Sequence, residues 1–364
     1  MQFSVSKSAL VQALALASRA IEKRATIPIL TNVKLEAGED FLTITGTDME
    51  AAISVRVAAE VKEPGSTTIP GAKLYSYVRL LSEGAVKFKL DTANQWTTIT
   101  AGKARTKMAG VPVESFPEAP AEPETLLTVP VGAFAALVNR TKLAISAEAS
   151  RFTLNGALLE CRDGRLVMVA TDGHRLAYAS QPSDGEKLST IIPLNALKHI
   201  ASLTEGVESL AIGQDDNHLF FRAGQALLIS RKMSGNFPDY KRVLPGELPR
   251  IVTLKRAELA GAVSRVMQFA DERSHAIRLS LKDGALEVFS SSVETGESTE
   301  TVECDYAGGG EVEVGFNASY LLEFLSVLDC ESVTFHLNDG KAAGELRPAG
   351  GGEEYRYVVM PMRI

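Results

Sequence analysis

Hydrophobic and polar positions along the chain follow a pattern that occurs three times. Each copy opens with apolar residues at helical spacing, seen in SVSKSALVQALALASRA, TVPVGAFAALVNRTKLA and VTLKRAELAGAVSRVMQFA. Leu10, Leu137 and Leu259 occupy equivalent positions, separated by 127 and then 122 residues. A repeat of this length is one structural unit used three times, so the fold has to be interpreted unit by unit.

Two strand-like segments with a short polar turn follow each of these helices. They are VKLEAGEDFLTITGTD, ALLECRDGRLVMVATD and IRLSLKDGALEVFSSS, in which Asp-Gly or Gly-Glu at the turn and alternating apolar residues predict a hairpin. A second helix and strand then recur, with Ile69, Ile192 and Val314 in register. Each copy closes on a strand that leads toward a proline, at Phe116-Pro117, Phe237-Pro238 and Met360-Pro361.

The repeat predicts an α+β fold of three similar domains, each with two short helices and several antiparallel strands. We expect domains at residues 1–123, 124–249 and 250–364, because FPEAPAEPET and LPGELPRI have the composition of linkers. The alternative is three similar domains on a string, an arrangement that many adhesins and scaffolds use.

The charge of the chain is distributed unevenly. A formal net charge of −7 argues against an ordinary electrostatic DNA binder, because such proteins use Lys and Arg to replace counterions on phosphates. The six predicted helices, at 7–20, 71–82, 130–144, 194–204, 255–269 and 318–328, nevertheless carry +8 together and leave −15 elsewhere. Basic helices could line a positively charged hole. Alternatively, these cations are ordinary residues on the solvated faces of amphipathic helices.

Two charged segments bear on assembly. Lys103, Arg105 and Lys107 alternate along KARTKM near the end of the first unit, which places them on one face of a strand. The third unit carries ETGESTETVECDY, with the acidic residues Glu294, Glu297, Glu300 and Glu303. A basic and an acidic edge suit head-to-tail contact, which closes into a ring when the rotation allows. Each segment alone could also be a charged edge strand that resists aggregation.

Catalytic and metal-binding patterns are not found in the sequence, so we expect no enzyme activity and no cofactor. Asp172 and His174 could form an acid–base pair, but no Ser or Cys stands in a GxSxG context. The five histidines lack HExxH spacing, the three cysteines lack a CxxC pair, and no Walker motif occurs. No run of 18 to 20 apolar residues and no export signal is found, so we expect a cytoplasmic protein that does not enter membranes.

Four motifs give the sequence a specific resemblance. TDGHRL from Thr171, FPDYKRVLP from Phe237, GFNASYLL from Gly315 and YVVMPMRI from Tyr357 resemble the bacterial DNA polymerase III beta subunit, and the similarity extends over essentially the whole chain. The resemblance implies a head-to-tail homodimeric ring around double-stranded DNA, with helices facing the hole and binding that is independent of sequence. It also implies a sliding clamp that tethers the replicative DNA polymerase, the clamp loader and other proteins with clamp-binding motifs.

The resemblance also implies sites for these partners. The partner-peptide pocket would consist of Leu154, Thr171, Gly173, His174, Arg175, Leu176, Pro238, Arg242, Val243, Tyr320, Val358, Val359, Met360, Pro361, Met362 and Arg363. The DNA contacts would be Arg24, Lys73, Arg79 and Lys198. We expect the subunit contact at Lys103, Arg105, Lys107, Phe269, Glu297, Glu300 and Glu303, with Phe269 as its apolar centre.

The sequence departs from the family pattern at two places. Phe152-Thr153 stands where some relatives have two tyrosines, and Ala342 and Ala343 align poorly. Two rival functions stay open: a hydrolase that uses His174 and Asp172, and a passive three-domain scaffold that never contacts DNA.

Overall fold

The computed structural model describes residues 1–22, 26–246, 248–306, 310–351 and 354–363. Its Cα positions fall into two compact units. Unit 1 comprises Met1–Gly132 and Asn195–Lys232, and unit 2 comprises Ala133–Leu194 and Met233–Ile364. Each unit therefore combines one end of the chain with part of the middle repeat.

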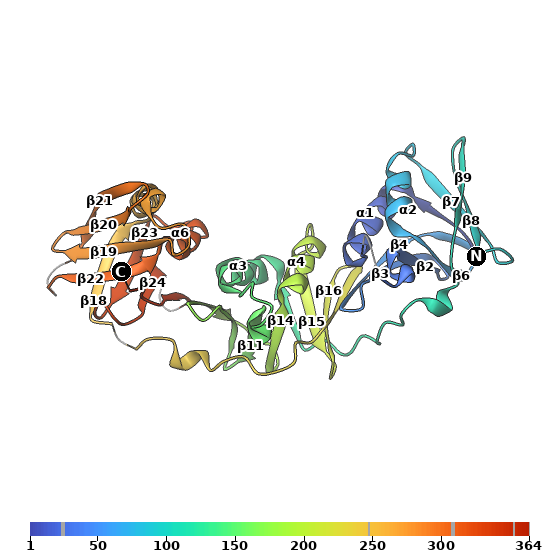
Figure 1. Cartoon of the computed structure of the whole chain (residues 1–364). Coiled ribbons are helices and arrows are strands. Elements are labelled where there is room, and N and C mark those ends of the chain that lie inside the picture. Colours follow the sequence, from blue (N-terminus) through green and yellow to red (C-terminus); the bar gives the residue numbers. More distant parts are fainter. Residues whose placement is uncertain (23–25, 247, 307–309, 352–353, 364) are drawn as a thin grey trace. The chain divides into compact units, whose positions relative to one another are not determined.

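Unit 1 contains two antiparallel sheets (Figure 1). The five-stranded sheet has the order β5-β1-β7-β8-β9 and the eight-stranded sheet the order β10-β15-β16-β17-β4-β3-β2-β6. Their strands are β1 (Gln2–Ser6), β2 (Asn32–Ala37), β3 (Phe41–Thr47), β4 (Ala51–Ala58), β5 (Glu60–Glu63), β6 (Gly65–Pro70), β7 (Ala85–Asp91), β8 (Trp96–Ala101), β9 (Ala104–Ala109), β10 (Leu127–Pro130), β15 (Ser209–Gln214), β16 (His218–Ala223) and β17 (Ala226–Arg231). The helices are α1 (Lys7–Ala17), α2 (Gly71–Arg79) and nearly all of α4 (Leu194–Leu203), with the 3-10 turns η1 (Ser18–Ala20), η2 (Pro28–Thr31) and η3 (Val113–Ser115).

Unit 2 contains a twelve-stranded sheet of order β14-β11-β12-β13-β25-β24-β23-β18-β21-β20-β19-β22. Its strands are β11 (Gly156–Arg162), β12 (Arg165–Thr171), β13 (Arg175–Pro182), β14 (Leu188–Pro193), β18 (Arg250–Lys255), β19 (Ala276–Lys282), β20 (Ala285–Ser292), β21 (Gly296–Asp305), β22 (Val312–Asn317), β23 (Ser332–Leu337), β24 (Gly344–Pro348) and β25 (Tyr355–Val359). Its helices are most of α3 (Val131–Thr141), α5 (Arg256–Val266) and α6 (Ala318–Ser326), with η4 (Lys142–Ala144), η5 (Phe152–Leu154), η6 (Tyr240–Arg242) and η7 (Met267–Phe269).

Helices form at all six predicted windows, so that prediction is confirmed. Ser6 caps α1 by accepting a hydrogen bond from the Ala9 amide, and Asn317 caps α6 by accepting one from Ser319. The helices bury one apolar face, as at Leu10 and Leu14 of α1. α1 packs against α2 in unit 1, and α5 packs against α6 in unit 2. None of the helices in the described ranges is long and apolar enough to cross a membrane.

The three predicted hairpins are confirmed as β2–β3, β11–β12 and β19–β20, each of them antiparallel. The predicted closing strand is present in all three repeats, as β9, β17 and β25, but only β25 runs up to its proline motif, ending one residue before Met360. In the first repeat β9 ends at Ala109, and η3 precedes Phe116. Pro112 follows β9 by three residues and lacks the amide hydrogen that a strand ladder needs, whereas β17 ends at Arg231, well before Pro238.

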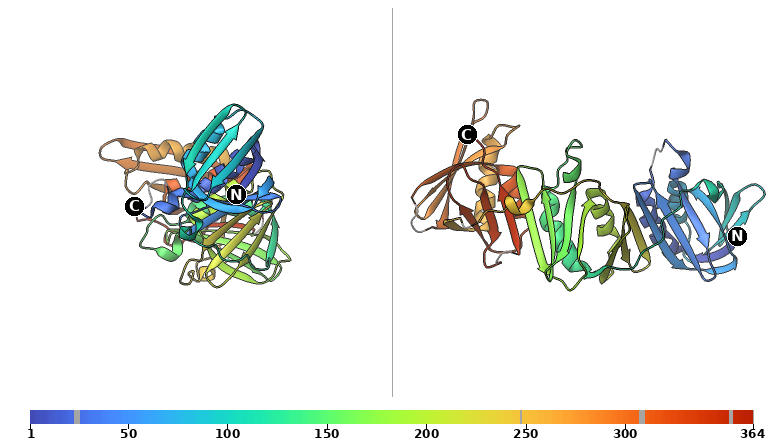
Figure 2. Two further views of the ribbon diagram at one scale, coloured as in Figure 1. Left: turned by 90° about the vertical axis from the view of Figure 1, so that its right-hand side faces the viewer. Right: turned by 90° about the horizontal axis from the view of Figure 1, so that it is seen from below.

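Strand pairing joins consecutive repeats. In unit 1, β17 of the second repeat pairs with β4 of the first, from Ala226 opposite Val55 to Ser230 opposite Ala51. In unit 2, β25 of the third repeat pairs with β13 of the second. Figure 2 shows this second junction, with the red end of the chain beside the light-green strands. The last strand of the following repeat thereby covers the edge of β4 in the first repeat and of β13 in the second, which leaves no open ladder at these two edges.

A buried charge cluster fixes the segment that enters the third repeat. Glu345 of β24 is fully buried and accepts hydrogen bonds from Arg347 and Arg356, both at 3.0 Å. Arg356 also donates to the backbone oxygen of Pro245 at 2.7 Å. Burial alone would raise the pKa of Glu345, but the hydrogen bonds and charges of Arg356 and Arg347 outweigh burial and lower it.

We predict that Glu345 makes the stability of the protein depend on pH. A carboxyl whose folded pKa lies below its unfolded value of about 4.3 stabilises the fold above that value. This stabilisation is lost as the pH falls through the folded pKa. Glu345→Gln should lower the melting temperature at pH 7, and the difference from the parent should shrink as the pH falls below 4. Glu272→Gln, at an exposed position, serves as the control. A pH-independent difference in differential scanning fluorimetry would contradict this role.

Candidate functional site

The TDGHRL motif forms a tight turn between β12 and β13. The hydroxyl of Thr171 donates to the Arg175 oxygen at 2.6 Å and accepts from the Gly173 amide at 3.1 Å. Asp172 Oδ1 accepts from the amides of His174 and Arg175 at 2.9 and 3.0 Å. Gly173 has φ of 87°, in the region that favours glycine. These bonds explain why Thr, Asp and Gly occur in this order, and they leave His174 exposed at the surface.

Arg151, the residue before η5, supports the turn. Its guanidinium donates to the backbone oxygen of Asp172 and forms an ion pair with Glu148 at 2.9 Å. A Cβ atom at Gly173 would lie only 2.6 Å from the Arg151 Nη1 atom. Arg151 was not among the predicted pocket residues. Nothing in the sequence indicates this role, because the partner oxygen is a backbone atom 21 residues away.

Arg175 connects the turn to the third repeat. Its side chain is 8% exposed and lies 4.2 Å from the centre of the Tyr320 ring. It pairs with Asp172 at 3.1 Å and Glu323 at 2.8 Å, and it donates to the Tyr357 hydroxyl at 3.1 Å. Burial opposes its charge, but Tyr357 and Glu323 more than compensate and raise the pKa of Arg175. In these contacts Arg175 acts as a positioning residue that holds α6 and β25 beside the turn.

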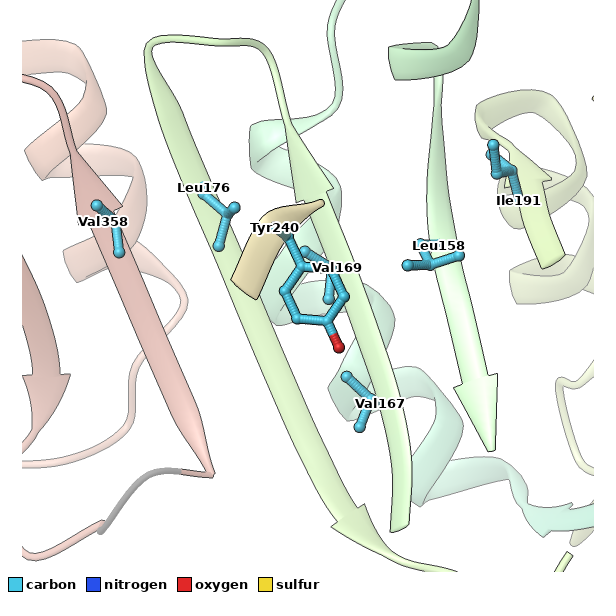
Figure 3. Close-up of a cluster of buried hydrophobic side chains, with 7 residues drawn as sticks. All are labelled: Leu158, Val167, Val169, Leu176, Ile191, Tyr240 and Val358. Carbon is cyan, nitrogen blue, oxygen red and sulfur yellow. The ribbon is translucent and has the colours of Figure 1, made fainter. Parts of the chain in front are cut away.

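A compact apolar cluster lies next to this turn (Figure 3). Leu176 and Val358 are each 1% exposed, so they can form only the buried floor of the predicted peptide site. The Tyr240 ring lies over the central strands in Figure 3. Its hydroxyl donates to Glu160 at 2.8 Å and accepts from Arg162 at 3.0 Å. Burial, followed by the hydrogen bond to Glu160, raises the pKa of Tyr240, which therefore stays neutral. The buried members of the cluster are Leu158, Val167, Val169, Leu176, Ile191, Tyr240 and Val358.

The remaining residues predicted for the peptide site also lie in unit 2. Val243 packs on the apolar cluster, whereas Arg242 is exposed and pairs with Asp239 at 3.0 Å. Met360 is 39% exposed, and its amide donates to the His174 oxygen at 2.9 Å. Leu154, Pro361 and Met362 are half-buried, Pro238 and Arg363 are exposed, and Val359 is fully buried.

The tail is held by backbone as well as side-chain contacts. The Met362 amide donates to the Gly315 oxygen at 2.8 Å, which bridges the tail to β22. The turn and the tail, predicted to share a site, are therefore joined through Met360 to His174, while the tail is also anchored near the start of α6. The arrangement presents soft apolar side chains beside a rigid buried floor, a combination that suits binding of an apolar anchor.

The predicted DNA contacts lie on helices of unit 1, except for Arg24, which falls outside the described residues. Lys73 and Arg79 are exposed on α2, and Lys198 is exposed on α4. Burial lowers the pKa of His199, and the nearby charges of Arg19 and Lys198 lower it further against the opposing effect of Asp48. Arg19 and Lys198 therefore both lie near His199. Arg19 was counted in the helix charge but was not among the predicted DNA contacts.

Several charges assigned to the helices and edges have partners within the chain. Arg265 of α5 pairs with Glu300 of β21, with one hydrogen bond at 2.8 Å, and Lys7 pairs with Glu83 at 2.8 Å. Glu300 was predicted for the subunit contact, but within the chain its carboxylate is already paired with Arg265 of α5. The other predicted contact residues are Lys103, Arg105 and Lys107, exposed on or beside β9, Glu297 and Glu303, exposed on β21, and Phe269, half-buried in η7.

The acid–base hypothesis for Asp172 and His174 finds little support in the geometry. One oxygen of Asp172 accepts two backbone amides and the other pairs with Arg175, so the carboxylate is committed to the turn. Among the described residues, no group of three or more His, Cys, Asp or Glu side chains is placed to hold a metal ion.

The chain is similar to one family along its whole length. Models of the DNA polymerase III beta subunit match in three consecutive pieces: the N-terminal domain at residues 1–120, the central domain at 128–239 and the C-terminal domain at 241–363. The predicted boundaries near 123 and 249 stay predictions.

Individual relatives agree with the family models. The beta sliding clamp of Pseudomonas aeruginosa is 34% identical over 372 residues and that of Escherichia coli K12 is 31% identical over 370 residues, with 100% of both chains covered in each case. A crystal structure of the P. aeruginosa sliding clamp bound to griselimycin matches with a TM-score of 0.94 and 34% identity, again over 100% of each chain.

We predict that Arg175→Lys destabilises the protein. Lysine keeps the charge but cannot bridge Asp172, Glu323 and Tyr357 with a planar fork. Losing charge-assisted bonds at this buried position should cost about 2 kcal/mol and lower the melting temperature by roughly 4–8 °C. Arg273→Lys, at an exposed position in the same unit, should leave the melting temperature unchanged. Equal melting temperatures for Arg175→Lys and the parent would refute the positioning role.

Proposed function

The chain belongs to the bacterial DNA polymerase III beta subunit family, the beta sliding clamps, and we propose that it encircles duplex DNA as a homodimeric ring. The single observation that carries this proposal is the match of all three family domains in order, with relatives covered from end to end. A sliding clamp is a processivity factor, so its task is mechanical retention instead of chemical turnover. We propose that the protein is not an enzyme and works in the bacterial cytoplasm.

Ring closure would join the first repeat of one subunit to the third repeat of another. Exposed Lys103, Arg105 and Lys107 give β9 a basic edge, and Glu297 and Glu303 leave negative charge on β21. Complementary edges on a single chain generate a closed assembly when the rotation permits. Charges at a solvated rim contribute little affinity alone, so the contact also needs an apolar centre. We propose that Phe269 supplies it. Arg265 would compete for Glu300 within its own chain.

Duplex DNA would be held by topology and only weakly by contact. Lys73, Arg79 and Lys198, together with Arg19, are positive groups on helices of a chain that is negative overall. A few phosphate contacts carry no sequence information, and they weaken as salt increases. Such contacts would permit sliding, while the closed ring prevents loss of the DNA.

Partner proteins would bind at the turn between β12 and β13. An apolar anchor would pack on the half-buried Met362 and Val243, which would adjust to related peptides above the buried Leu176 and Val358. We propose that the replicative polymerase, the clamp loader and other proteins with clamp-binding motifs use this site in turn. The griselimycin complex of a relative supports ligand binding by clamps of this family.

Small-angle X-ray scattering of the purified protein tests ring formation. The expected particle has twice the 39.0 kDa chain mass, with few interatomic vectors through its centre. Phe269→Asp should reduce the mass to that of one chain, since a buried unpaired carboxylate at an interface is costly. It should also abolish retention on nicked circular DNA after loading.

The control is Phe152→Asp, a change of an exposed aromatic residue outside the predicted subunit contact, which should leave the dimer intact. A dimeric Phe269→Asp would show that the contact lies elsewhere. A monomeric parent would instead favour the passive scaffold.

Deleting Met360–Ile364 should weaken partner binding sharply without opening the ring. The deletion removes the Met360 and Met362 side chains and the backbone bonds to His174 and Gly315. Fluorescence anisotropy with a labelled peptide that carries a leucine-phenylalanine anchor should show a loss of about tenfold or more, equivalent to about 1.4 kcal/mol. The same peptide with alanines at the anchor is the control. Unchanged affinity would refute this site.

A further inference from the structure

Unit 1 repeats the turn that forms the partner site of unit 2. Thr47 donates to the Ala51 oxygen at 2.9 Å and accepts from the Met49 amide at 3.0 Å, as Thr171 does in its own turn. Asp48 Oδ1 accepts from the amides of Glu50 and Ala51 at 3.0 and 2.7 Å. Met49 has φ of 73°, at the position where the second turn has Gly173.

The neighbouring strand is also repeated. β17 pairs with β4 so that Ile229 lies opposite Ala52, as Val358 lies opposite Leu176 in unit 2. The Arg231 amide donates to the Glu50 oxygen at 2.9 Å, which matches the bond from Met360 to His174. Unit 1 therefore contains the same scaffold, built from the first two repeats.

The two scaffolds differ in what covers the apolar floor. In unit 2 the ring of Tyr240, from FPDYK, closes over the cluster. The equivalent segment in unit 1 is FPEAP, and Ala119 occupies the position of that tyrosine. Beside Ala119 lies a cavity of about 130 Å³, lined among others by Phe116, Glu118 and Ile229. Because an apolar cavity of about 150 Å³ can hold benzene, this cavity is close to the size of one aromatic ring.

The cavity has an apolar base, and among the charged residues of its lining Glu50 and Glu118 outnumber Arg231. Ile229 is 4% exposed and packs with Phe220 and Leu227, while Met49 is 54% exposed at the edge. Arg231 is paired with Glu50 at 3.3 Å, so these two charges offset each other. Glu118 is exposed at the rim and has no ion pair among the described residues. The adjoining segment VESFPEAPAEPE adds further glutamates and no cation.

We propose that this cavity is a second docking site, which takes one aromatic side chain of a partner peptide flanked by lysine or arginine. The incoming ring fills the space that Tyr240 fills from within the chain at the other site. The basic flanks complement Glu118, and electrostatic complementarity of this kind selects among peptides that share an anchor. The proposal does not depend on the partner site of unit 2, because every residue of the cavity belongs to unit 1.

The test uses the full chain and three short labelled peptides in fluorescence anisotropy. One has a central phenylalanine flanked by lysines, one has alanine in place of the phenylalanine, and one has glutamates in place of the lysines. Only the first should bind well, and its affinity should fall as salt is added. Equal binding of the first two peptides would mean that no ring enters the cavity, which would overturn the proposal.

Ala119→Tyr tests the site directly, because it supplies the missing ring from within the chain. This exposed residue can change without disturbing a core, and the variant should weaken the lysine-phenylalanine peptide by at least about tenfold. Glu118→Lys should weaken it by a comparable factor. Ala119→Ser and Glu39→Lys, both at exposed positions, are the matched controls and should bind as the parent does.

Deletion of Met360–Ile364 separates the two sites. The lysine-phenylalanine peptide should bind the deletion variant unchanged, whereas the leucine-phenylalanine partner peptide should not. Loss of both peptides would assign the lysine-phenylalanine peptide to the partner site and overturn the second site. Parent-like binding by Ala119→Tyr would overturn it as well, even if the partner site behaves as proposed.

Discussion

Backbone pairing between repeats is the constraint on which the rest of this structure depends. A hairpin such as β12–β13 exposes unpaired amides and carbonyls at its edge, and those groups need partners when they are not solvated. The chain supplies them with the last strand of the following repeat, through β13 with β25 and β4 with β17. A single repeat is therefore incomplete, and its edge becomes the place where a neighbour and its side chains are fixed.

The candidate partner site is a product of that pairing. Because β25 continues the ladder of β13, the tail that follows Val359 emerges beside the TDGHRL turn. Arg175 then secures the junction through Asp172, Glu323 and Tyr357. Burying an arginine costs desolvation free energy, and removing one of its partners leaves its charge uncompensated. Arg175 therefore favours the one arrangement of turn, α6 and β25 in which all its partners are present. The rigid floor and the adjustable rim together suit a surface that binds several related peptides.

The two repeated turns, at Thr47 and at Thr171, share a scaffold but differ in the side chains around them. The turns at Thr47 and Thr171 have the same hydrogen bonds, yet one neighbours Ala119 and an open cavity and the other neighbours Tyr240 and a filled cluster. The charges without an ion pair among the described residues differ too, with Glu118 at the first site and Arg363 in the tail of the second. Basic residues on α2 and α4 belong to neither site, and weak phosphate contact is their proposed role.

The sequence by itself determined the repeat, the six helices and the three hairpins, because apolar periodicity and turn residues act over short distances along the chain. It also supplied the family motifs that indicate the partner site. Tertiary structure decided which strands of different repeats pair, since the backbone groups of an edge strand are the same whichever strand they pair with. It gave the buried Arg175 its partners, brought Arg151 to a backbone oxygen in the turn, and paired Glu300 with Arg265. It also left space beside Ala119, because packing depends on the volumes of side chains that are distant in sequence.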